Sequence, residues 1–100
     1  SLDEIERIRA RVAAVCAPLG RRVDVVVNYD GARIDEEVAD AYAAMVADVT
    51  ARFYARVSRY SGSAFMRLKL GRALSGRAVA PHIFETAEEA RAFLDAGEGI

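Results

Sequence analysis

The stretch RVDVVVNY, residues 22–29, is followed at once by Asp30 and Gly31 and decides the fold class. Its four valines are β-branched and almost continuous, which predicts a strand covered on both of its faces. The sequence from Asn28 to Gly31 is a turn signal that ends the strand. A strand that is covered on both faces is typical of an α/β domain, in which helices pack on a sheet.

Segments with helical and with strand periodicity alternate around this first strand. Apolar residues at steps of three and four predict helices over about 2–17, 35–53 and 64–74, and after residue 86. Shorter apolar runs predict two further strands, over about 55–60 and 78–84. The order is a helix and then three strand–helix units. The chain is therefore predicted to be a single α/β domain over residues 1–100, with a small parallel or mixed sheet and helices on its faces.

Polar residues mark the beginnings of the predicted helices. Capping-box spacing occurs in Ser1–Glu4 and again in Thr86–Glu89. Asp35 is a candidate N-cap of the longest helix. In the helix over about 64–74, the apolar pattern predicts that Phe65, Leu68 and either Leu70 or Ala73 face the core.

The composition excludes several classes of protein. The chain is 53% hydrophobic and 29% charged, which is typical of a globular domain. Its net charge of −1 argues against a nucleic-acid partner. Cys16 is the only cysteine, so an intrachain disulfide and a Cys-rich metal site are excluded, and a reducing cytoplasm is expected. No apolar run approaches the roughly 18 residues of a membrane span, so no membrane partner is expected. The chain begins at Ser1 without a methionine, and we expect it to be cut from a longer protein.

The stretch RYSGSAFMRLKLG, residues 59–71, is the best candidate for ligand binding. A strand that leads into a Ser-Gly-Ser helix start presents free backbone N–H groups and the positive end of the helix dipole. With Arg59 before it and Arg67 after it, this start can hold a phosphate or carboxylate. Ser61 or Ser63 is also a candidate for phosphorylation. The alternative interpretation is ordinary N-capping by one of these serines. Neither a glycine-rich phosphate loop nor a dinucleotide fingerprint occurs, so no cofactor is predicted.

Three other residues are candidates for a site. Asp30 follows the carboxyl end of a strand, where open α/β sheets tend to bind ligands, although it can equally form an Asx turn. His82 is the only histidine, which excludes a His-rich metal site, and it is either catalytic or a packed strand residue. Tyr60 stands beside Arg59, and both residue types favour interfaces.

The order of the elements over about residues 20–95 resembles the STAS-like fold of anti-sigma-factor antagonists. In that family a Ser-Gly pair opens a helix, an acidic residue precedes the pair, and a partner kinase phosphorylates the serine. Ser61 and Gly62 match the pair, whereas Arg59 and Tyr60 stand where the acid would be. This resemblance implies a regulatory module that binds an anion, a nucleotide or a CoA phosphate at Ser61–Ser63.

A second resemblance extends over nearly the whole chain. The motifs that carry it are VNYD (27–30), Tyr54, RY (59–60), SAF (63–65), RLKLG (67–71) and APHIFE (80–85). They resemble the C-terminal segment of bacterial acyl-CoA:acetate/3-ketoacid CoA-transferases, which transfer CoA between an acyl-CoA and a carboxylic acid. In that family the nucleophilic glutamate lies in the catalytic core, which these residues do not include.

The CoA-transferase resemblance implies a non-catalytic accessory or assembly domain. Its partner would be the CoA-transferase core of the same parent chain, and a homo-oligomer is a further expectation. Tyr29, Arg59 and Tyr60 are the first candidates for the docking surface. The third interpretation is a small free-standing enzyme that uses Asp30, Ser61 and His82.

Overall fold

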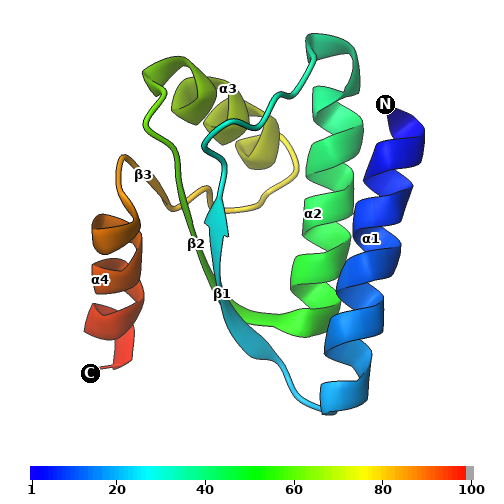
Figure 1. Ribbon diagram of the computed structural model, residues 1–100, viewed down its shortest axis with the longest axis vertical. Helices are drawn as coiled ribbons and strands as arrows, with labels where there is room; N and C mark the ends of the chain where they lie inside the picture. Colours follow the sequence, from blue (N-terminus) through cyan, green and yellow to red (C-terminus); the bar gives the residue numbers. More distant parts are fainter. Residues whose placement is uncertain (99–100) are drawn as a thin grey trace.

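Residues 1–98, which a computed structural model describes, form four α-helices and a three-stranded sheet in alternation (Figure 1). The helices are α1 (Leu2–Cys16), α2 (Ala39–Phe53), α3 (Ala64–Ser75) and α4 (Ala87–Glu98). The strands are β1 (Val23–Asn28), β2 (Tyr54–Tyr60) and β3 (Ile83–Phe84). Single-turn 3₁₀ helices occupy Ala17–Leu19 and Glu36–Val38. The predicted α/β class and the order of a helix and three strand–helix units are confirmed.

The sheet is parallel, and its strands follow the order of the chain, β1-β2-β3. The third strand is much shorter than the predicted 78–84, because β3 pairs with β2 only at Arg59 and Tyr60. Two features of the preceding segment explain the difference. Pro81 has no N–H to donate to a neighbouring strand. Ala78 and His82 have φ angles of 59° and 39°, which lie outside the extended region.

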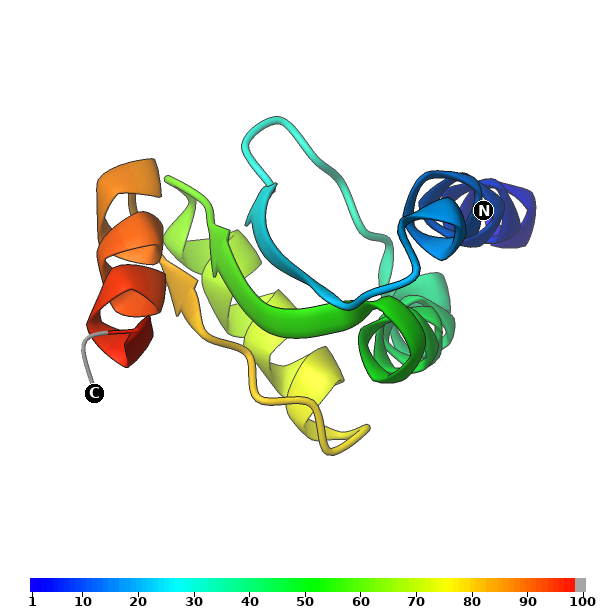
Figure 2. The same cartoon turned by 90° about the horizontal axis from the view of Figure 1, so that it is seen from below.

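The helices cover the sheet unequally. Figures 1 and 2 show α4 on one side of the strands and α1 and α2 on the other. The side chain of Arg56 lies on the α4 side. It donates hydrogen bonds to the carboxylate of Asp24 on β1 and to the carbonyl of Leu94 on α4, the latter over 3.0 Å. The other side holds most of the core, in which Met45 and Leu74 are almost completely buried.

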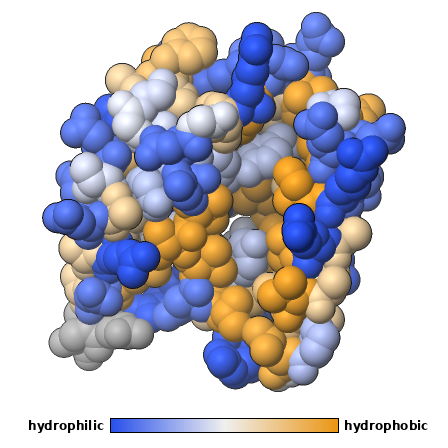
Figure 3. Space-filling model, in the orientation of Figure 1, coloured by the Kyte–Doolittle hydropathy of each residue, from blue (hydrophilic) through white to orange (hydrophobic). Residues whose placement is uncertain are grey.

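β1 differs from the predicted strand in its surroundings. It lies at an edge of the sheet, and its valines are half-buried rather than covered on both faces. In the space-filling view of Figure 3, hydrophobic residues surround a hollow near the centre, and hydrophilic residues dominate the periphery.

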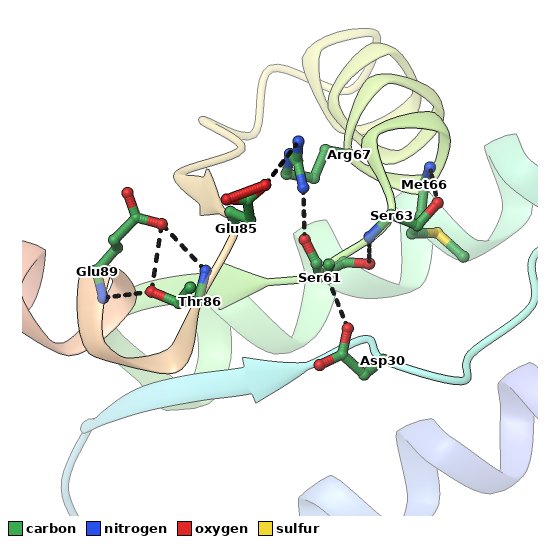
Figure 4. Close-up of polar contacts among 9 residues, drawn as sticks. Asp30, Ser61, Ser63, Met66, Arg67, Glu85, Thr86 and Glu89 are labelled. Atoms are coloured by element: carbon green, nitrogen blue, oxygen red, sulfur yellow. Dashed lines mark hydrogen bonds and ion pairs between the residues drawn. The ribbon is translucent and has the colours of Figure 1, made fainter.

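The predicted caps are present at the first and last helices. The backbone N–H of Glu4 donates to Ser1 Oγ over 3.3 Å. Thr86 and Glu89 form a reciprocal capping box, with backbone N–H groups that each donate to the other's side chain over 3.1 Å (Figure 4). Asp35 only precedes the 3₁₀ turn and makes no side-chain capping bond, so its prediction as the side-chain cap of the long helix is wrong.

α3 faces the core differently from the prediction. Met66, Leu70 and Leu74, spaced four residues apart, are buried, whereas Phe65 is 74% exposed and Leu68 is 54% exposed. This helix carries apolar residues on two faces, and only one of them can pack against α2. The prediction is therefore confirmed for Leu70 and wrong for Phe65 and Leu68, which leave an apolar surface outside. None of the helices described over residues 1–98 is long and apolar enough to cross a membrane.

Candidate functional site

The turns after β1 and β2 meet, and they bring together residues that lie about thirty positions apart in the sequence. The backbone N–H of Gly62 donates to Asp30 Oδ1 over 2.7 Å. The backbone N–H of Asp30 donates to Asn28 Oδ1 over 2.8 Å, so the Asx turn is formed by the side chain of Asn28 and not by that of Asp30. Figure 4 shows Asp30 reaching toward the turn that precedes α3. We call Asp30 and Ser61–Ser63 the turn site.

The amides of the turn site have acceptors within the protein. Ser63 donates its N–H to Ser61 Oγ, and Met66 donates its N–H to Ser63 Oγ, each over 3.1 Å. Ser63 is therefore the N-cap of α3. The carboxylate of Asp30 supplies negative charge where the helix dipole favours it. This geometry matches the N-capping interpretation, and the binding of an anion from outside stays a prediction.

Two of the candidate side chains fix this turn from within. Ser61 is only 1% exposed, so a kinase could reach its hydroxyl only after local opening. Arg67 donates from Nη1 to the carbonyl of Ser61 over 2.7 Å, and its Nη2 lies 4.0 Å from Glu85 Oε1. Arg67 therefore holds the turn and the end of β3 together.

Arg59 and His82 belong to a different part of the molecule. Arg59 is 1% exposed, and its Nη1 donates to the carbonyls of Ala80 (3.3 Å) and Pro81 (2.8 Å). His82 is exposed, and its ring centroid lies 4.5 Å from that of Phe93 on α4. Asp30 and Ser61 line one hollow and His82 lines another, so the residues of the free-standing enzyme interpretation do not share a site.

The tyrosines of the candidate docking surface are not strongly exposed. Tyr29 is 5% exposed, and its hydroxyl lies 2.6 Å from that of Tyr42. Burial raises the pKa of Tyr42 far above its usual range, and the nearby Tyr29 adds to the shift. Tyr60 is half-buried and pairs with Asn28 and Phe84 in the sheet. Tyr29 therefore supports the structure from inside rather than presenting its ring to a partner.

A hollow that the sequence did not predict follows the edge of β2. It has a volume of about 800 Å³ and is bounded by α2, β2, α4 and the segment 77–82. We call it the edge groove. Its walls include the alanines at positions 47, 51 and 55, whose small side chains leave the space open. In the sequence, only these alanines could have indicated an open space, but alanines are equally typical of ordinary close packing between elements.

A second surface that the sequence did not predict is the outer side of α3. Phe65 borders two hollows, one of about 390 Å³ toward α2 and one of about 380 Å³ toward the loop 29–35. Lys69 Nζ lies 5.9 Å from the centre of the Phe65 ring and 3.8 Å from Glu36 Oε2. We call Phe65, Leu68, Lys69 and their flanking hollows the α3 face.

Among the side chains that the structure describes, which end at residue 96, no group of three or more His, Cys, Asp and Glu is placed to hold a metal ion. No protein-family model matches the chain, and neither a curated protein nor a solved structure does.

Proposed function

We propose that this chain is a non-catalytic accessory domain that packs against the CoA-transferase core of the same parent protein. The observation that carries the proposal is the α3 face, where Phe65 is 74% exposed and Leu68 is 54% exposed on neighbouring turns. Burial of apolar surface stabilises by about 25 cal/mol per Å². An aromatic and a leucine side by side on an otherwise polar helix surface therefore favour a contact with another protein surface.

The surroundings of Phe65 also suit an interface. The ring stands between two hollows, so a partner can contact it from both sides. Lys69 lies beside the ring, and Arg72 follows one turn later on the border of the same hollow. Aromatic residues with basic neighbours are frequent among the residues that contribute most to binding.

The resemblance to CoA-transferases supports the choice of partner. Two of its motifs, SAF (63–65) and RLKLG (67–71), lie in the turn before α3 and in α3 itself. The same stretch therefore carries the family resemblance and the outward apolar surface. The parent reaction, transfer of CoA between an acyl-CoA and a carboxylic acid, is part of this proposal and would occur in the core.

The test compares two double variants of the full parent protein. Phe65→Ser with Leu68→Ser removes the α3 face. Leu2→Ser with Val15→Ser is the matched control, because these α1 side chains are 61% and 64% exposed. We expect the first variant to lose the association between the domain and the core, with reduced CoA transfer, and the control to keep both. Association is measured by gel filtration after proteolytic separation of the two parts, and transfer by a CoA-exchange assay.

The outcomes separate the parts of the proposal. If the α3-face variant behaves like the control, this surface does not dock the domain. If the parent without residues 1–100 transfers CoA at the original rate and stays assembled, the accessory role is refuted. If the α3-face variant instead abolishes self-association of the isolated chain in sedimentation, a second copy occupies the surface and the proposed partner is wrong.

A further inference from the structure

β2 has an edge that the rest of the chain leaves open. β3 pairs only with Arg59 and Tyr60, so residues 54–58 have no strand beside them on that side among the described residues. The N–H of Arg59 donates toward β3, to the carbonyl of His82 over 2.9 Å. Because a strand alternates with a period of two, the N–H of Val57 points toward the same open side.

The segment before β3 is held away from this edge. Ala78 adopts the left-handed conformation, with a φ of 59°, and Pro81 has no N–H to donate. Ala78 lies in the turn that ends α3, where the N–H groups of Ala78 and Val79 donate to the carbonyls of Ser75 and Leu74 over 3.1 and 2.9 Å. Both residues follow α3 directly, and Ala78 lines the edge groove. Because of this turn and Pro81, the segment before β3 forms no paired strand beside residues 54–58 among the described residues.

The edge groove has the size and the walls for an added strand. Residues 54–58 extend over at most about 16 Å at roughly 3.3 Å per residue, with a register shift opposite Val23–Val25, and this length matches a short strand. The groove of about 800 Å³ reaches around this edge, with Ala47 and Ala51 of α2 on one side and Phe93 and Leu94 of α4 on the other. An extended chain placed there would put its alternate side chains against these two apolar walls.

Arg59 supplies the charge that selects the occupant. This arginine lines the groove, is 1% exposed, and has a buried Nε without a hydrogen-bond partner. Among the described residues its acceptors are two backbone carbonyls, and no carboxylate there forms an ion pair with it. Six other arginines do pair with carboxylates, at positions 9, 33, 52, 56, 67 and 77. A buried charge without a counter-charge is costly, so a carboxylate from outside would be favoured there.

A second orphan polar atom belongs to the same groove. Thr50 Oγ1 is buried without a partner, and Thr50 lines the wall formed by α2. Among the described residues that line the groove there is no Asp or Glu. The lining therefore complements an apolar occupant that carries an acid.

We propose that the edge groove binds an extended peptide segment of a partner protein, which pairs as an additional strand beside residues 54–58 and places an Asp or Glu carboxylate on Arg59. Backbone hydrogen bonds to the open edge provide affinity, and the apolar walls and Arg59 provide the sequence preference. This site is separate from the α3 face, so it neither requires the proposed CoA-transferase assembly nor tests it.

The probe is a phage-displayed library of random dodecapeptides selected on the 100-residue chain. A parallel selection uses Ala51→Trp, which fills the groove from an exposed helix position, and Ala14→Trp on α1 is the control for the added tryptophan. We expect the wild-type and Ala14→Trp chains to enrich peptides with alternating apolar residues and one acid, and Ala51→Trp to enrich none of them. Nuclear magnetic resonance spectra of each protein confirm that it is folded.

An enriched peptide is then tested in a double-mutant cycle. We expect Arg59→Met, or replacement of the peptide acid by its amide, to weaken binding by about tenfold or more. The two changes together should weaken it no further than one alone, because they remove the same pair. Hydrogen exchange at the Val57 amide should slow when the peptide binds, which is a readout that a contact elsewhere would not change.

Four results would overturn the proposal. The first is enrichment of the same peptides on Ala51→Trp, which would place them outside the groove. The second is an absence of coupling between Arg59 and the peptide acid. The third is tight binding with unchanged exchange at Val57, as expected for a helical peptide, since only an added strand pairs with the edge. The fourth is a selection in which no peptide is enriched more on the wild-type chain than on Ala51→Trp, which would exclude strand binding in the groove.

Discussion

The buried hydroxyl pair of Tyr29 and Tyr42 connects the turn after β1 to α2. Its 2.6 Å separation lets one hydroxyl donate to the other inside an otherwise apolar region. Burial disfavours the ionised form of a tyrosine, which is why the pKa of Tyr42 is raised. The burial of Tyr42 therefore makes the domain less stable at alkaline pH, and the nearby Tyr29 adds to this effect.

We expect Tyr42→Phe to reduce the alkaline sensitivity of the domain. In the unfolded chain a tyrosine ionises near pH 10, whereas folded Tyr42 stays neutral there. Its raised pKa thus contributes stability that is complete below about pH 10 and is lost as the pH rises further, by up to about 1.4 kcal/mol per pH unit. Urea unfolding of both proteins between neutral and alkaline pH measures this difference.

The internal control is the neutral range, where wild type and variant should differ by a constant amount. Burial also raises the pKa of Tyr54, so Tyr42→Phe should lessen the alkaline loss without abolishing it. Parallel curves over the whole range would show that Tyr42 ionises normally in the folded protein.

At the scale of elements, α3 combines two apolar faces with different tasks. Leu70, 1% exposed, fills the core against α2, while Leu68 contributes to the α3 face. The two leucines are two residues apart in one helix, so they form a matched pair for substitution.

We expect Leu70→Ala to lower the free energy of unfolding by about 2–5 kcal/mol, because it removes buried methylene groups and leaves a cavity. Leu68→Ala should change it by only about 0.5 kcal/mol, as for an ordinary surface substitution. Chemical denaturation of the two variants checks the difference. Equal losses would mean that Leu68 is covered in solution, for example by a second copy of the chain.

The sequence predicted elements where local patterns are decisive. The capping box of Thr86 and Glu89 and the turn at Asn28–Gly31 are local signals, and both structures form as expected. β3 was overestimated because the apolar run over 78–84 does not reveal the left-handed φ of Ala78 and His82. The inward face of α3 was also predicted wrongly at Phe65 and Leu68, because the choice between the two apolar faces of the helix depends on packing against α2.

The candidate sites likewise divide into features that local patterns predict and features that depend on tertiary packing. Asp30 and Ser61 were expected at the carboxyl ends of strands, and their meeting follows from the parallel pairing of β1 and β2. The edge groove joins residues of α2, β2 and α4 that are far apart in the sequence, so no local pattern announces it. The burial of Arg59 is likewise a tertiary fact, since its place in a strand is compatible with a position on the surface.

At the scale of the whole molecule, two ion pairs join distant segments. Arg56 binds Asp24 between β2 and β1, and Arg77 binds Asp40 between the end of α3 and the start of α2. The hydrogen bond from Arg56 lowers the pKa of Asp24, and that from Arg77 lowers the pKa of Asp40. Both carboxylates are accessible to solvent, so salt screens these pairs.

We expect the two pairs to contribute stability that is lost in acid. Because the folded pKa of each carboxyl is lowered, the contribution is present above the unfolded value of about 3.9 and disappears as the pH falls below it. Asp24→Asn with Asp40→Asn should therefore flatten the acid limb of the stability curve, and high salt should do so partly in wild type. Thermal unfolding at neutral and acidic pH measures both effects; an unchanged acid limb would show that other carboxyls dominate.

The strand order also has a consequence for how the protein comes into being. Because β1, β2 and β3 lie side by side in the order of the chain, each strand finds its neighbour in the next unit to leave the ribosome. β1, α2 and β2 can therefore associate while β3 and α4 are still being synthesised. Until that last unit arrives, the edge of β2 that β3 partly covers is bare along its whole length, and a bare strand edge can pair with another copy of the nascent chain.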